Sequence, residues 1–318
     1  MLQRLSCSRD QGDRDLDFSV NHLCDGRPGN DTDFLSAFAI EVEHLGFTGL
    51  YFPEHVVLFD TYDSRYPYRR FVADEDSHVS EVEVGRDQGL FDPLVACAVA
   101  GMATSRLRVG TSVLVTVVRD PVVLAKEVAT IDHVTGGRLD LGLGVGWLRK
   151  EIEAAGGSFD RRGARLDEYI GAMKSLWMEA RSSYQGEFVN FEDAISFPKP
   201  LQDPHPPILA GGNSRAMIRR AARHCQGWYP WNMTIVEATE SLRVLDEELE
   251  SVGRTRRDLR VIFGVRHQCD PGDLTDYVEE LDALGVDEIV FSFRIRPDDY
   301  QELLGHAATV FGLNSSKA

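Results

Sequence analysis

Short apolar runs alternate with helical patterns along nearly the whole chain. The apolar runs are rich in Val, Ile, Leu and aromatic residues, which is typical of buried strands. They lie at residues 16–22, 49–52, 107–115, 139–144, 207–210, 227–229, 259–264 and 288–293. Between them, apolar residues recur at the spacing of amphipathic helices, over residues 32–45, 93–104, 122–133, 165–180, 214–224, 235–252, 275–284 and 298–311.

This strict alternation of strands and helices predicts an α/β fold, a (β/α)8 TIM barrel, rather than an open sheet. We expect one barrel domain over residues 1–318, with the polar segment 1–15 as a flexible tail. Two segments are longer than ordinary connections. One is an extended loop after the second strand, residues 56–90, and the other is a short insertion after the fourth helix, residues 182–205. The insertion has the pattern of a small hairpin.

The most informative segment is residues 106–147, which read as strand, long helix, strand. Two apolar strands joined by a crossover helix form a parallel unit, and ligands bind at the carboxyl ends of parallel strands. The first strand leads to Arg119, Asp120 and Pro121, and the second ends in the glycine-rich turn 142–147. Both unusual loops therefore lie at the same end, which indicates a cofactor site.

Glu54 and His55 directly follow the predicted strand at residues 49–52. This position lies at the catalytic face of a barrel, and imidazole titrates near neutral pH. His55 could therefore donate or accept a proton or a hydrogen bond during a reaction. The alternative is a histidine that only orders its own loop.

The turn from Gly211 through Gly212 and Asn213 to Ser214 ends the fifth strand and begins a helix. Glycines let backbone N–H groups approach an anion, and the start of a helix supplies unpaired N–H donors and a positive dipole. The turn could therefore hold a phosphate. An ordinary strand-to-helix connection with a capping serine has the same sequence, so both interpretations stay open.

Composition excludes several classes of function. The formal net charge of −17 argues against nucleic acid and anionic membranes as partners. The five cysteines are scattered and never spaced as CxxC, which fits free thiols in the cytoplasm. The nine histidines form neither HxH on the first strand nor HExxH, and we expect no catalytic metal.

A series of short motifs runs in order through nearly the whole chain. The motifs occupy residues 45–47, 53–57, 64–68, 91–94, 110–114, 121–127, 136–139, 142–147, 161–165, 206–212 and 227–228. They include Pro-Glu-His-Val-Val at the second strand, Phe-Asp-Pro-Leu before the second helix and Gly-Leu-Gly-Val-Gly-Trp after the fourth strand. No single motif is decisive. Together they resemble the luciferase-like monooxygenase superfamily, and more narrowly its actinobacterial branch of F420-dependent oxidoreductases.

The resemblance implies roles for particular residues. It implies a bulge with a non-prolyl cis peptide bond at Ser112–Val113, with Val113 behind the flavin-type ring. His55 and Glu54 would be the catalytic residues. The cofactor would be held by Thr111, Ser112, Val113, Arg119, Gly144, Gly146, Gly211, Gly212, Asn213 and Ser214, and the substrate would contact Tyr62, Tyr66, Tyr68 and Trp147. Trp147 stands where the family's sugar-phosphate dehydrogenases have a catalytic Glu, which argues against that substrate class.

The function that follows is hydride transfer between coenzyme F420 and a small organic substrate, apolar or ring-containing because the long loop is rich in tyrosine. An alternative is an FMN-dependent monooxygenase that uses O2 and receives reduced flavin from a partner reductase. A third is a flavin-binding protein without catalysis. Members of the family commonly form dimers, so a homodimer is expected.

Overall fold

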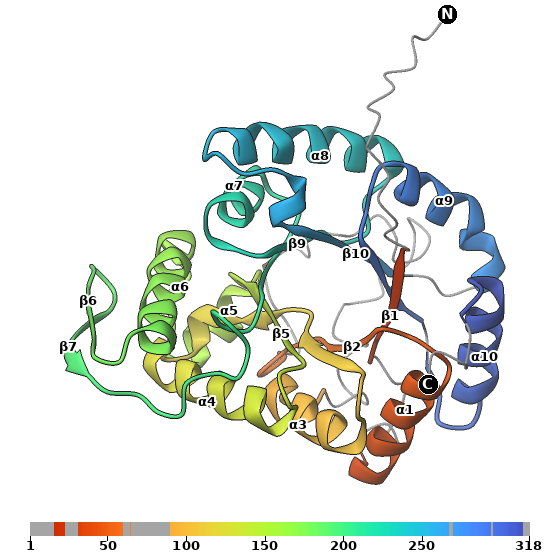
Figure 1. The fold of residues 1–318 in the computed structure, drawn as a ribbon, viewed down its shortest axis with the longest axis horizontal. Helices are drawn as coiled ribbons and strands as arrows, with labels where there is room; N and C mark the ends of the chain where they lie inside the picture. The colour runs from red at the N-terminus through yellow and green to blue at the C-terminus, as the bar shows by residue number, and fades with distance from the viewer. Residues whose placement is uncertain are drawn as a thin grey trace, which may run out of the picture.

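The structure, a computed structural model, describes residues 16–22, 31–59, 64, 90–266, 270–293 and 295–313. Parallel strands form a closed barrel with helices on its outside (Figure 1). The strands are β1 (Asp17–Asn21), β2 (Gly49–Phe52), β3 (Arg108–Thr111), β4 (Leu114–Val115), β5 (Leu139–Gly144), β8 (Ile208–Gly211), β9 (Gly227–Tyr229), β10 (Arg260–Arg266) and β11 (Glu288–Ser292). Because β5 pairs with both β3 and β4, the ring closes. The fold is the predicted (β/α)8 TIM barrel.

The outer layer consists of α1 (Thr32–His44), α3 (Pro93–Ala103), α4 (Pro121–Val134), α6 (Arg162–Met178), α7 (Arg215–His224), α8 (Ile235–Glu250), α9 (Thr275–Ala283) and α10 (Tyr300–Val310). Local signals fix several helix starts, since the side chain of Asp31 caps α1 and that of Ser214 caps α7. No helix among the described residues is long and apolar enough to cross a membrane.

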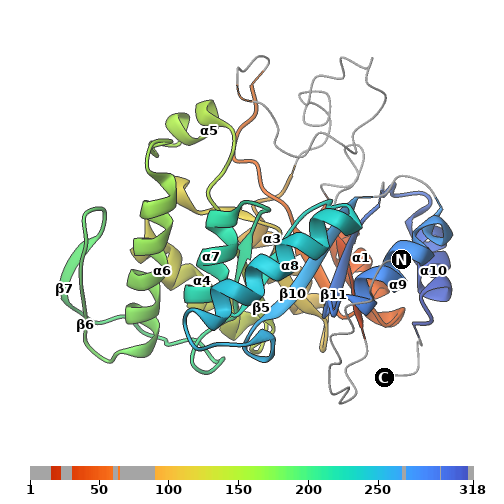
Figure 2. The same ribbon diagram turned by 90° about the horizontal axis from the view of Figure 1, so that it is seen from above.

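Two features depart from the plain alternation. The predicted strand at residues 107–115 is interrupted at Ser112 and Val113, which are joined by a cis peptide bond. A short helix, α5 (Arg149–Ala154), follows β5 and lies beyond the ring of outer helices in Figure 2.

The predicted hairpin after the fourth helix is confirmed as β6 (Ser182–Gln185) and β7 (Asn190–Ala194). The extended loop after β2 falls largely outside the described residues.

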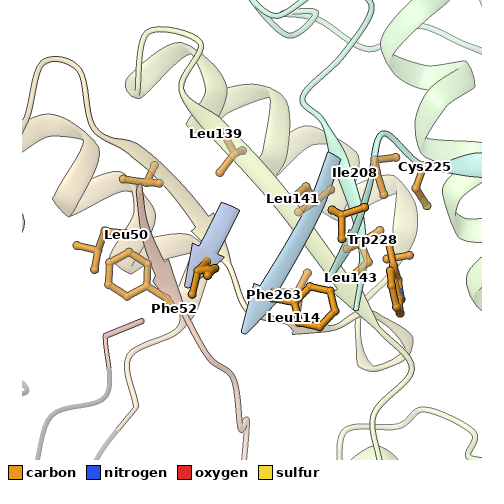
Figure 3. Close-up of a cluster of buried hydrophobic side chains, with 14 of the residues drawn as sticks. Leu50, Phe52, Leu114, Leu139, Leu141, Leu143, Ile208, Cys225, Trp228 and Phe263 are labelled. Atoms are coloured by element: carbon orange, nitrogen blue, oxygen red, sulfur yellow. The ribbon is translucent and has the colours of Figure 1, made fainter. Parts of the chain in front are cut away.

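Side chains of β5 alternate between two environments. Leu139, Leu141 and Leu143 belong to the large apolar core between sheet and helices, together with Leu50, Ile208 and Trp228 (Figure 3). The residues between them, Asp140, Gly142 and Gly144, therefore face the inside of the barrel. This period of two is what brings chemically different residues to the two faces of one strand.

The inside of the barrel carries a buried ionic cluster near the strand beginnings. Asp140 of β5 accepts a hydrogen bond from Arg108 Nε at 2.8 Å and pairs with Arg260 Nη1 at 3.2 Å. Arg260 also pairs with Glu288, which accepts from Ser19 Oγ at 2.5 Å. Burial alone would raise the pKa of Asp140, but Arg260 and Arg108 lower it to about 2. The cluster therefore stays ionised inside the protein.

We expect acid to destabilise the protein through His22. This side chain is buried among Phe34, Phe38 and Phe52, and burial lowers its pKa from 6.5 to about 4. The unfolded chain binds the proton more tightly, so stability is lost as pH falls from about 6.5 to about 4, by roughly 3 kcal/mol in total. Urea unfolding at several pH values measures this loss. His22→Gln should flatten the dependence in that window, and an unchanged slope in this variant would contradict the assignment.

Candidate functional site

The end of β2 is tied to the bulge between β3 and β4. Ser112 N donates to Phe52 O at 2.8 Å, and Val115 N donates to Glu54 Oε2 at 2.5 Å. Arg119 Nη2 pairs with Glu54 Oε1 at 2.6 Å and with an oxygen of Asp92 at 2.7 Å. Burial raises the pKa of Glu54, and Arg119 and Val115 N oppose that rise. Glu54 and Arg119, which the sequence placed in the site, are thus joined in one buried ion pair that holds the bulge.

Val113 packs against glycines of two neighbouring strands, β5 and β8. A Cβ added to Gly144 would lie 2.7 Å from Val113 Cγ2, and one added to Gly211 would lie 2.5 Å from Val113 Cγ1. The space at these glycines is therefore filled by Val113, whose side chain is half-buried. Thr111 Oγ1 donates to Gly142 O at 2.6 Å and joins β3 to β5 beside this contact.

A larger residue at position 144 should displace Val113. We expect Gly144→Ala to destabilise the protein by about 1–3 kcal/mol through overpacking, measured by urea unfolding. Val113→Ala in the same chain should recover part of that loss, because Val113 Cβ lies at an ordinary 3.8 Å from the added methyl group. Strictly additive effects of the two substitutions would show that they do not interact.

His55 is held by a buried carboxylate from α5. Its Nδ1 lies 3.1 Å from Glu151 Oε2, and Glu151 Oε1 accepts from Val56 N at 2.6 Å. The ring of Trp147 stands perpendicular to the imidazole, with 5.8 Å between ring centres. The structure thus brings the predicted residues His55 and Trp147 together. It adds Glu151, which the sequence analysis missed because a six-residue helix has too few turns to show a period.

The turn after β8 is occupied by contacts within the protein. Gly212 N donates to Tyr229 O at 2.9 Å, and Ser214 Oγ accepts from Met217 N at 3.3 Å. The Asn213 side chain forms two bonds to the backbone of Trp231, donating to its oxygen at 2.7 Å and accepting from its nitrogen at 2.8 Å. The side chains of this turn therefore serve the strand-to-helix connection. An anion here would use backbone N–H groups in the first turn of α7.

Gly146 shapes the loop that follows β5. Its φ of 72° lies in the left-handed region that favours glycine. A Cβ at this position would lie 2.8 Å from Val115 Cγ1 and 3.0 Å from Ile152 Cδ1. Gly146 therefore lets the loop pack between β4 and α5, and so sets where Trp147 and Glu151 stand.

Two buried hydroxyl groups with few internal partners lie near the carboxyl ends of the strands. Oγ of Ser292 has no hydrogen-bond partner among the described residues, and the hydroxyl of Tyr229 has the Ser112 side chain beside it. Ser112 Oγ donates to Asn21 Oδ1 at 2.8 Å, and the half-buried Ser112 also lies close to the Tyr229 phenol. Burial raises the pKa of Tyr229 well above its ordinary value, so the phenol keeps its proton. A planar ligand with a polar edge over Val113 fits these residues.

Tyr62, Tyr66 and Tyr68, the predicted substrate contacts, lie outside the described residues. One described residue of the same loop, Ser64, accepts a hydrogen bond from Arg149 N at 3.2 Å, which joins that point of the loop to the start of α5. Among the residues that the structure describes, no three His, Cys, Asp or Glu side chains are placed to bind a metal ion.

Comparison with known proteins identifies the family of this chain. The profile of the luciferase-like monooxygenases matches residues 18–284. The chain belongs to this family. An uncharacterized protein of Mycobacterium tuberculosis, Rv0953c, is 32% identical over 265 residues, which cover 83% of this chain and 88% of the relative.

Two further proteins that are similar to this chain, one in sequence and one in fold, carry named activities. An FMNH(2)-dependent dimethylsulfone monooxygenase of Pseudomonas putida is 40% identical over 124 residues, 38% of this chain and 34% of that enzyme. The coenzyme F420 dependent tetrahydromethanopterin reductase from Methanopyrus kandleri has a similar structure, with a TM-score of 0.71 at 13% identity over 92% of this chain and 97% of that one. At that identity the likeness concerns the fold alone. The proteins similar to this chain thus include one named for F420 and one named for FMN.

Proposed function

We propose that this luciferase-like oxidoreductase transfers a hydride between coenzyme F420 and an organic substrate that is apolar or contains a ring. The observation that carries the proposal is His55, a partly exposed imidazole fixed by buried Glu151 at the carboxyl end of β2. The next barrel strand, β3–β4, places the half-buried Val113 surface at the same end. A proton-transfer group and an apolar ring support at one barrel mouth are what coupled hydride and proton transfer requires.

Each residue of the site would have a separate task. Val113 would support one face of the ring, while Ser112 and the buried hydroxyl of Tyr229 would bind its polar edge. Gly144 and Gly146 would place the surrounding loop, Thr111, Glu54 and Arg119 would hold the bulge, and the turn from Gly211 through Gly212 and Asn213 to Ser214 would present backbone N–H groups to a phosphate. When bound, F420 supplies the hydride acceptor or donor. His55 would hold or release the accompanying proton, with the substrate between Trp147 and the tyrosines Tyr62, Tyr66 and Tyr68.

A second candidate is an FMN-dependent monooxygenase that uses O2 with flavin reduced by a partner reductase. It is favoured by the identity of 40% to the dimethylsulfone monooxygenase over 124 residues. The residues around Val113 suit either ring system, because apolar support and hydrogen bonds to a polar edge do not distinguish the two.

Fluorescence titration with F420 and with FMN tests the proposal. We expect saturable F420 binding that is tighter than FMN binding, and bleaching of F420 absorbance when a substrate is present. Oxygen uptake on mixing with reduced FMN would favour the monooxygenase instead. A protein with no affinity for either cofactor would overturn both candidates.

We also propose a cytoplasmic homodimer of single-domain chains. The support is a group of exposed apolar side chains on α1, α3 and α4, which lie side by side in Figure 1. They are Ile40, Val95, Met102, Val122 and Val123, with Met102 77% exposed. Large apolar side chains exposed on neighbouring helices are a surface that a second copy of the chain could cover. Sedimentation equilibrium should give twice the chain mass, and a monomer at micromolar concentration would contradict the proposal.

A further inference from the structure

Glu151 is a buried carboxylate whose hydrogen-bond contacts within the described part of the chain go to the segment that carries His55. Its side chain is 1% exposed, whereas that of His55 is 23% exposed. One oxygen lies 3.1 Å from His55 Nδ1, and the other accepts from Val56 N at 2.6 Å. The carboxylate therefore contacts both the imidazole and the backbone of the residue that follows it.

These contacts decide which ring nitrogen carries the proton. An ionised carboxylate only accepts hydrogen bonds, so the nitrogen that faces it must be a donor. Neutral His55 then has its proton on Nδ1, and Nε2 keeps an unshared electron pair. The structure thus makes Nε2, the atom away from Glu151, the proton acceptor of the neutral ring.

We infer that Glu151 is the positioning residue that fixes the tautomer and orientation of His55. The inference rests on the proposed function in that His55 is the group that exchanges a proton with the substrate. Glu151 acts through His55, because its burial and its contacts to Nδ1 and Val56 N keep it from a substrate. In this role, neutral His55 accepts a proton at Nε2, and the imidazolium returns it.

Glu54, the buried carboxylate that directly precedes His55 in the sequence, does not take this role. Both oxygens of Glu54 are engaged, one with Arg119 at 2.6 Å and the other with Val115 N at 2.5 Å. The planes of the imidazole and of the Trp147 ring are perpendicular, and this contact limits how far the imidazole can rotate. Glu151 thus sets the tautomer, and Trp147 restricts the ring from a second side.

The test is long-range proton–nitrogen NMR of the whole protein with 15N-labelled histidine, assigned by comparison with His55→Ala. In the neutral ring of the wild type we expect a protonated Nδ1 and an unprotonated Nε2. In Glu151→Gln the amide NH2 can donate to Nδ1, so the proton should move to Nε2. A wild-type ring protonated on Nε2 would overturn the inference, and this result does not depend on whether the variant folds.

A second readout is the rate at which diethylpyrocarbonate modifies His55, followed by peptide mass analysis. The reagent needs a free electron pair, so Glu151→Gln should slow the modification roughly tenfold to a hundredfold, the factor expected when a hydrogen bond to a charged group is lost. Glu153→Gln is the matched control, because Glu153 lies on the same helix but is 52% exposed and pairs with Arg149. Equal rates in wild type and both variants would overturn the inference.

Neither measurement uses a cofactor. A protein that binds neither F420 nor FMN but has the Nδ1-protonated ring would remove the proposed function while supporting the role of Glu151 toward His55. A protein that binds F420 but has the opposite tautomer would remove only the inference.

Discussion

Replacing His55 by Ala should slow hydride transfer by about 10²- to 10⁴-fold, the usual contribution of a positioned acid or base. Cofactor affinity should change little, because the ring support comes from Val113 and the phosphate contacts from the turn after β8. The measurements are F420 affinity by fluorescence titration and the rate of substrate-dependent F420 bleaching.

His306→Ala is the control for this substitution. His306 is exposed on α10 and pairs with Asp270, so its loss should leave both binding and rate unchanged. If His55→Ala bound F420 and kept the wild-type rate, His55 would have no part in proton transfer. Binding of F420 by the wild type without substrate-dependent bleaching would instead support the interpretation as a flavin-binding protein without catalysis.

Asp140→Asn should destabilise the protein by about 3–5 kcal/mol, because it takes the buried counter-charge away from half-buried Arg108 and leaves Arg260 with Glu288 alone. Arg108 and Arg260 both pair with Asp140, which is fully buried, and the Tyr51 hydroxyl donates to it at 3.1 Å. Asparagine keeps the shape of the side chain, so the loss reports on charge. Urea unfolding at neutral pH measures it.

The control for the ionic cluster is Asp193→Asn on the surface hairpin. Asp193 is 66% exposed and lies 3.7 Å from Arg181, so its pair contributes less than about 1 kcal/mol. Its positive φ of 53° is one that asparagine also adopts readily. Similar losses in the two variants would show that the cluster inside the barrel does not depend on the charge of Asp140.

Much of the fold could be predicted because its signals are local. Strand β2 and strand β5 have the predicted bounds, and the capping side chains of Asp31 and Ser214 mark where two helices begin. The break between β3 and β4 could not be read from the periodic pattern, since residues 107–115 have the composition of one strand. It was anticipated only through the family resemblance, and the structure shows it packed against glycines of β5 and β8.

The sequence predicted where the candidate site lies better than it predicted which side chains contact each other there. The site loops were expected at the carboxyl ends of the strands, and the structure brings His55 and Trp147 together there. Glu151 was missed, and Glu54 pairs with Arg119 rather than standing free. The side chain of Asn213 likewise forms hydrogen bonds to the backbone of Trp231. Side-chain partners of this kind depend on distance in space, which spacing along the chain does not give.

The sequence by itself determined the alternation of strands and helices, and with it the barrel and the end at which its site loops gather. These follow from the period of apolar residues and from local capping, which act over a few residues. The tertiary structure alone decided that Glu151 faces His55, that Val113 fills the space left by distant glycines, and that Asp140 lies between Arg108 and Arg260. Barrel closure is the physical reason, because it brings together residues far apart in the chain, such as Asp140 and Arg260, which are separated by 120 positions.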